Sequence, residues 1–217
     1  MTRLGVIRRA TSPTSGANTP ANPESARRLT PRDAATLVIV DRSCGVPRVL
    51  MGRRHPGQVF LPDTFVFPGG RVEAGDRALA RRHILPASEM ESLTHAMRGR
   101  PSQTRATALA LAAIRETFEE TGFIVGTPDT DPLSGREAGS PAGWRPFLAQ
   151  GFRPHLDGLA FFARAITPPG RPRRYDTRFF IVDAGSATHL PSPVDGELLD
   201  IDWFTLKEAG RLALPSI

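Results

Sequence analysis

Residues 104–121 read TRATALALAAIRETFEET and are followed by Gly122. Alanine and leucine are strong helix formers, and a glycine directly after such a run is a common helix end. At about 100° per residue, Leu111, Ile114 and Phe118 fall on one stripe, and three glutamates fall on the other side. The stretch therefore predicts a helix over 104–121 with an apolar face and an acidic face.

The glutamates at the end of this helix, Glu116, Glu119 and Glu120, raise its energy. Their charges repel one another, and carboxylates near a helix C-terminus lie at the unfavourable end of the helix dipole. Arg115 supplies only one compensating charge. The acidic side is either a solvated surface or a site for a hard divalent cation, because Mg²⁺ prefers carboxylate and phosphate oxygens.

Short runs of β-branched and aromatic residues around the helix predict a sheet. They are AATLVIVD (34–41), RVLMGRR (48–54), TFVF (64–67), LAFFARAI (159–166), TRFFIVD (177–183) and LLDIDWF (198–204). Capping-box pairs predict two more helices, at about 88–98 behind Ser88 and Glu91, and after Thr205 and Glu208. Strands and helices without regular alternation predict an α/β (α+β) fold, a mixed sheet flanked by helices.

The composition is that of one globular domain. The chain has 217 residues, 40% of them hydrophobic and 23% charged, and no apolar run is long enough to cross a membrane. Residues 1–33 are rich in Ser, Thr, Pro and Asn and predict a flexible basic tail before a domain at 34–217. A single cysteine, Cys44, suggests a reducing, cytoplasmic setting. The apolar end LALPSI leaves open whether the natural chain continues past Ile217.

The net charge of +6 does not by itself favour nucleic-acid binding. Of the 28 basic residues only Lys207 is a lysine, and this bias towards arginine is typical of GC-rich coding sequence. A small-molecule partner is therefore the simpler expectation.

Two separated segments, FPGGRVEAGD (67–76) and RETFEETGF (115–123), together resemble the signature of the Nudix hydrolases. In that signature a glycine and a glutamate precede Arg-Glu-aliphatic-x-Glu-Glu-x-Gly-aliphatic. Gly70 fits the first glycine, Asp76 stands where glutamate is usual, and Thr117 replaces the aliphatic residue. The two parts of the signature are separated by many more residues here than in the family. A helical insertion at about 77–104 therefore splits the signature. Such an insertion resembles the nudix 19-type (acyl-)coenzyme A diphosphatases.

The resemblance implies a Nudix fold and hydrolysis of a diphosphate that links a nucleoside to another moiety. It implies Mg²⁺ or Mn²⁺ held by Glu116, Glu119, Glu120 and the Gly70 carbonyl, with Arg115 orienting a carboxylate. The general base in such proteins is a signature glutamate or an acid on a later loop. Of Asp195, Glu197 and Asp200, which all lie in PVDGELLDID, we select Glu197.

Two arginine groups are candidates for binding the substrate. The first is Arg171, Arg173, Arg174 and Arg178 with Tyr175 as a stacking ring, and the second is Arg53, Arg54 and His55. The resemblance favours coenzyme A or acyl-coenzyme A, giving 3′,5′-ADP and (acyl-)phosphopantetheine. ADP-ribose or NADH hydrolysis and a non-catalytic nucleotide sensor are the alternatives, and a homodimer is left open.

Overall fold

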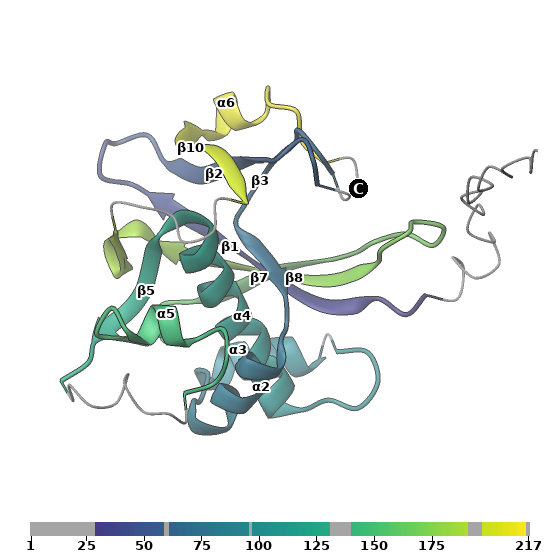
Figure 1. Cartoon of the computed structure of the whole chain (residues 1–217), viewed down its shortest axis with the longest axis vertical. Helices are drawn as coiled ribbons and strands as arrows, with labels where there is room; N and C mark the ends of the chain where they lie inside the picture. Colours follow the sequence, from purple (N-terminus) through teal and green to yellow (C-terminus); the bar gives the residue numbers. More distant parts are fainter. Residues whose placement is uncertain (1–28, 59–60, 96, 131–139, 191–196, 216–217) are drawn as a thin grey trace, which may run out of the picture.

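A computed structural model describes residues 29–58, 61–95, 97–130, 140–190 and 197–215 (Figure 1). The predicted tail at 1–33 lies outside the described residues except for its last few positions. The first strand begins at Arg32 rather than at the predicted Ala34. No helix in the described part of the chain is long and apolar enough to span a bilayer.

The core is a seven-stranded mixed sheet with the order β10-β2-β1-β8-β7, in which β3 also pairs with β2 and β4 with β1. Only β1 and β8 run parallel among these pairs. The strands are β1 (Arg32–Asp41), β2 (Arg48–Arg54), β3 (Phe65–Val66), β4 (Gly69–Arg71), β7 (Ala160–Ile166), β8 (Tyr175–Asp183) and β10 (Leu198–Thr205). The predicted mixed sheet is confirmed.

A smaller sheet of β5 (Phe123–Pro128), β6 (Phe152–Pro154) and β9 (Ala187–His189) adjoins the C-terminal end of the central helix. Its middle strand, β5, follows Gly122 directly, so the end of the helix turns at once into a strand. The single-turn helices α5 (Arg145–Leu148) and η2 (Ala184–Ser186) lie in the connections. This second sheet was not predicted.

Helices cover both faces of the large sheet. In β1, Leu37 and Ile39 join the main core with α4 (Gln103–Thr121), whereas Val38 and Val40 join a smaller cluster with Ala209 of α6 (Leu206–Ala209). Because successive residues of a strand face opposite sides, this alternation defines two apolar layers. The fold is therefore the expected sheet between helices.

Helix α4 confirms the helix predicted at 104–121. Ser102 caps its start by accepting a hydrogen bond from Arg105 N–H, and Gly122 ends it in the left-handed conformation at φ 74°. Helix α4 is more deeply buried than a helix with one apolar face and one acidic face would be. Ala108, Ala112 and other residues on all sides of it are buried. Even on the acidic side Glu120 is buried, and Glu116 and Glu119 are partly buried.

The predicted insertion contains half of α2 (Ala74–Leu79) and all of η1 (Ala80–Arg82) and α3 (Ala87–His95). Helix α3 begins at Ala87, so Ser88 lies inside its first turn and does not cap it as predicted. Leu85, Leu93 and Met97 belong to the main core. A hydrogen bond of 2.6 Å from Phe161 N–H of β7 to Glu89 Oε2 also ties α3 to the sheet.

Candidate active site

The acidic end of α4 lies against the two glycines of β4. Gly69 and Gly70 pair with Thr36 and Ala35 of β1, and Gly69 N–H donates a 2.8 Å hydrogen bond to Glu120 Oε2. A Cβ atom at Gly70 would lie 2.4 Å from the carboxyl carbon of Glu116. Glycine is therefore required for this contact, which places both carboxylates beside the β4 backbone.

Arg115 links the acidic side chains. Its guanidinium donates from Nη1 to Glu119 Oε2 at 2.6 Å and from Nη2 to Glu116 Oε1 at 3.0 Å. A fork of Nε and Nη2 binds the two Asp76 oxygens at 2.9 and 3.1 Å, and Nη2 also reaches the Arg71 carbonyl at 3.0 Å. Such bidentate contacts fix geometry as well as charge. Arg115 thus orients two of the three α4 glutamates.

Asp76 in turn holds Arg115. It is fully buried and accepts hydrogen bonds from Trp144 Nε1 at 2.9 Å and from Glu73 N–H at 2.8 Å. The aspartate that replaces the usual glutamate is therefore fully engaged with the signature arginine. Trp144 was not identified from the sequence. It is one of only two tryptophans in the chain, and the N–H of a buried tryptophan usually has a hydrogen-bond partner, which is the signal that could have found it.

Burial makes the charges of the two β4-facing carboxylates unfavourable. It raises the pKa of Glu116 to about 7, against the opposing effect of Arg115, and it raises the pKa of Glu120 well above its ordinary range. Oxygen donors with uncompensated negative charge suit a hard divalent cation. In this respect the residues fit the metal that the family resemblance implies.

The three α4 glutamates are not arranged to coordinate one metal ion together. Among the residues that the structure describes, no group of three or more His, Cys, Asp or Glu side chains is placed to hold a metal ion. Glu119 points to Arg115, whereas Glu116 and Glu120 lie against β4. A cation would therefore rely on Glu116 and Glu120, and Glu119 would have to leave Arg115 to join them.

A second group of polar residues approaches Glu120 from the other side. Arg54 lowers and Glu197 raises the pKa of Glu120, which puts both charges near that carboxyl group. Pairing of β10 with β2 sets Leu198 opposite Arg54, and His55 N–H donates to the Glu197 carbonyl at 3.4 Å. Gln58 Nε2 donates to Glu197 Oε2 at 3.3 Å. The loop acid selected from the sequence therefore lies near enough to Glu120 to raise the pKa of that carboxyl group.

Arg54 and Gln58 keep unused hydrogen-bonding capacity there. Arg54 Nε and Gln58 Oε1 are both buried and have no hydrogen-bond partner within the described residues. Arg53, in contrast, pairs with Asp63 and Asp200. Of the other acids considered, Asp195 lies outside the described residues. The second arginine patch thus contributes Arg54 to the site.

The first arginine group is not brought to the glutamates. Arg171 and Arg173 are exposed in the turn between β7 and β8, which extends away from α4 (Figure 1). Arg174 donates to the carbonyls of Thr167 and Leu29, and the neighbouring Tyr175 is the first residue of β8. These positions do not support the predicted contact with substrate phosphates.

Arg178 requires a correction. It is 0% exposed and pairs with Asp176, which also binds Arg164 at 2.7 Å. The guanidinium predicted to bind a substrate phosphate is therefore enclosed in a structural ion pair, because Asp176 and Arg164 lie beside it in the β7–β8 ladder.

No family model matches the chain, but individual known proteins are similar to it. The acyl-coenzyme A diphosphatase NUDT19 of Gallus gallus is 29% identical over 209 residues, which covers 74% of this chain and 54% of that protein. The human acyl-coenzyme A diphosphatase NUDT19 is 28% identical over 207 residues, covering 75% and 54%. The chain thus spans about half the length of the curated relatives that it matches.

A solved structure shows the same fold. The crystal structure of a NUDIX hydrolase from Alicyclobacillus acidocaldarius superposes with a TM-score of 0.63 and 28% identity, over 88% of this chain and 87% of that one. In its fold, its split signature and its relatives, the chain is similar to the Nudix hydrolase superfamily. Within that superfamily it resembles the acyl-coenzyme A diphosphatases NUDT19 of chicken and human.

Proposed function

We propose that this chain is a divalent-metal-dependent diphosphatase that cleaves coenzyme A or acyl-coenzyme A into 3′,5′-ADP and (acyl-)phosphopantetheine. The observation that carries the proposal is the pair of carboxylates held against Gly69 and Gly70, the partly buried Glu116 and the buried Glu120. The names of the chicken and human relatives support the choice of substrate.

Glu116 and Glu120 would hold Mg²⁺ or Mn²⁺, with Glu119 and the Gly70 carbonyl as the further ligands that the family resemblance implies. A bound divalent ion screens the phosphate charge and lowers the pKa of water. Arg115 keeps the carboxylates in place, and Asp76 and Trp144 keep Arg115 in place. The α4 carboxylates would otherwise repel an anionic substrate.

Glu197 is the proposed general base. Its carboxylate takes the proton from the attacking water, and the water oxygen bonds to phosphorus as the bridging P–O bond breaks. Gln58 supports this role because its Nε2 donates a hydrogen bond to Glu197 Oε2. Arg54 is the proposed contact for a non-bridging phosphate oxygen, because its buried Nε lacks a partner among the described residues and a guanidinium fork matches phosphate.

Product analysis on a panel of coenzyme A, dephospho-coenzyme A, ADP-ribose and NADH with Mg²⁺ or Mn²⁺ tests the substrate. We expect 3′,5′-ADP from coenzyme A to form faster than any product of the other three compounds. Faster cleavage of ADP-ribose or NADH would replace the proposed substrate. No cleavage of any compound, together with tight nucleotide binding, would favour the sensor alternative.

A further inference from the structure

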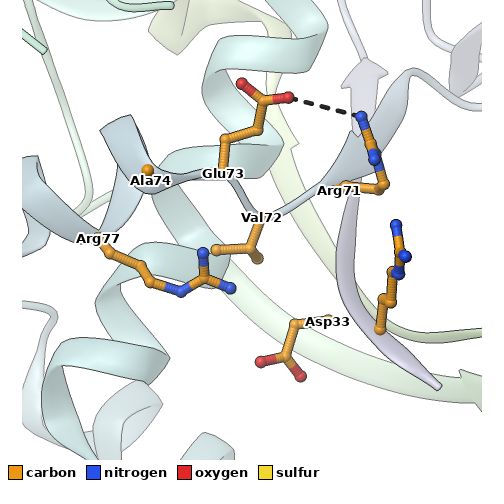
Figure 2. Close-up of a pocket in the computed structure, with 7 residues that line it drawn as sticks. Asp33, Arg71, Val72, Glu73, Ala74 and Arg77 are labelled. Carbon is orange, nitrogen blue, oxygen red and sulfur yellow. Dashed lines mark ion pairs between the residues drawn. The ribbon is translucent and has the colours of Figure 1, made fainter. Parts of the chain in front are cut away.

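A polar depression lies where the start of β1 meets the connection from β4 to α2. It has a volume of about 390 Å³, is open to solvent and is lined in part by Arg32, Asp33, Arg71, Glu73 and Arg77. Val72 N–H donates to the Asp33 carbonyl at 3.0 Å and joins the two walls. Figure 2 shows the Arg77 side chain extending from α2 across this space toward Val72 and Asp33. The volume lies within the range of small-ligand sites.

The positive charges in this depression exceed the negative charges that can neutralise them. Both Asp33 oxygens are occupied by Arg105, at 2.6 Å each. Glu73 faces Arg71 at 3.7 Å (Figure 2). The guanidinium groups of Arg32 and Arg77 have no ion-pair or hydrogen-bond partner within the described residues. Two free guanidinium groups around a small hollow are suited to a compact dianion.

The depression adjoins the candidate active site through β4. Arg71, in its wall, accepts a hydrogen bond at its carbonyl from Arg115 Nη2, and the same nitrogen donates to Glu116. The preceding residue, Gly70, touches the Glu116 carboxylate, and adjacent Cα atoms are about 3.8 Å apart. An anion here would therefore lie close to the proposed diphosphate site without occupying it.

We propose that this depression, through Arg32 and Arg77, binds a phosphate monoester of the substrate that is not cleaved. For coenzyme A that group is the ribose 3′-phosphate, so the identity of the ligand rests on the proposed function. The assignment moves 3′-phosphate recognition from the arginines at 171–178 to the start of β1 and to α2.

Kinetics of the Arg32→Gln/Arg77→Gln double variant on coenzyme A and dephospho-coenzyme A tests this proposal. We expect the ratio of the two kcat/KM values to fall about tenfold, because hydrogen bonds between charged groups are lost only for the 3′-phosphate. Arg81→Gln, which removes an exposed arginine of η1, is the matched control and should keep the wild-type ratio. An unchanged ratio in a folded double variant would overturn the assignment.

A binding measurement separates this proposal from the proposed function. Calorimetry with 3′,5′-ADP, 5′-AMP and inorganic phosphate needs no turnover, so it remains informative even if the chain cleaves nothing. Tighter binding of 3′,5′-ADP that the double variant loses supports the site. Equal binding of the two nucleotides overturns it, and so does a loss confined to inorganic phosphate, which would indicate a separate phosphate ligand.

Discussion

Glu120 is the residue at which stability and proposed function conflict. Glu120 is 3% exposed, and its carboxylate accepts a hydrogen bond from Gly69 N–H but forms no ion pair within the described residues. A buried carboxylate without a paired cation is costly, which is the reason for its raised pKa. Such a group is retained where a ligand, here a divalent cation, supplies the missing charge.

Glu120→Gln should stabilise the metal-free protein. Glutamine keeps the size of the side chain and an oxygen for Gly69 N–H, but it removes the buried charge. We expect a gain of about 1 kcal/mol at pH 8, or roughly 2–4 °C in melting temperature for a chain of this size. Thermal unfolding in excess chelator measures it, with the exposed Glu91→Gln as control. A melting temperature lowered by several degrees would show that the Glu120 charge is already compensated.

The β7–β8 ladder contains a buried ion-pair group that is structural. Burial alone would raise the pKa of Asp176, but hydrogen bonds from Arg164 and Arg178 outweigh it and hold that pKa below its ordinary value. A carboxyl group whose pKa is lower in the folded protein stabilises it above the unfolded pKa of 3.8, and this contribution is lost as the pH falls below that value.

Asp176→Asn should therefore destabilise the fold at neutral pH. The change leaves Arg178 buried without its counter-ion, which costs about 3–5 kcal/mol and lowers the melting temperature by roughly 6–20 °C. The difference from wild type should be constant between about pH 6 and 8 and shrink below about pH 4. Thermal unfolding across this pH range measures it. A variant within 1 °C of wild type at pH 7 would refute a structural role for the pair.

Elements with a strong local pattern were predictable from the sequence. Helix α4 and strands such as β2 match their predicted ranges closely, because their apolar periodicity and end residues act locally. Strand β4 was missed because two glycines have low strand propensity, and only pairing with β1 makes them a strand. The role of Arg178 depends on Asp176 and Arg164, so sequence alone could not separate it from surface arginines.

Some residues of the candidate site were predictable from the sequence, and others were not. The carboxylates of α4 and Arg115 come from one short segment with a family signature, and they lie together. Gln58 reaches Glu197, and Leu198 lies opposite Arg54, only because β10 pairs with β2, a contact between distant parts of the chain. Trp144 reaches Asp76 from a segment with no sequence pattern that places it there.

At the scale of the whole molecule, the segment that splits the signature is part of the core. Leu93 of α3 is fully buried in the cluster that includes α4, and Glu89 binds the β7 backbone. Removal of this segment would therefore expose the central helix. Deletion of residues 80–103 should unfold the protein.

Leu93→Ala provides a milder test of this integration. Truncation of a buried leucine leaves a cavity and costs about 2–5 kcal/mol, which should lower the melting temperature by roughly 4–20 °C. Ile84→Ala in the same segment is the matched control, because Ile84 is 85% exposed and its loss should leave the melting temperature unchanged. Equal melting temperatures for the Leu93 variant and wild type would show that the segment is a separate appendage.

The central claim is that the carboxylates of α4 form a metal-dependent diphosphatase site. Its most direct test is 3′,5′-ADP formation from coenzyme A with Mg²⁺ or Mn²⁺ by wild type, Glu116→Gln and Glu120→Gln, each first shown to be folded. We expect metal-dependent turnover by wild type and at least a hundredfold loss in each variant, about 2.7 kcal/mol of transition-state stabilisation. Wild-type rates in both folded variants would contradict the account.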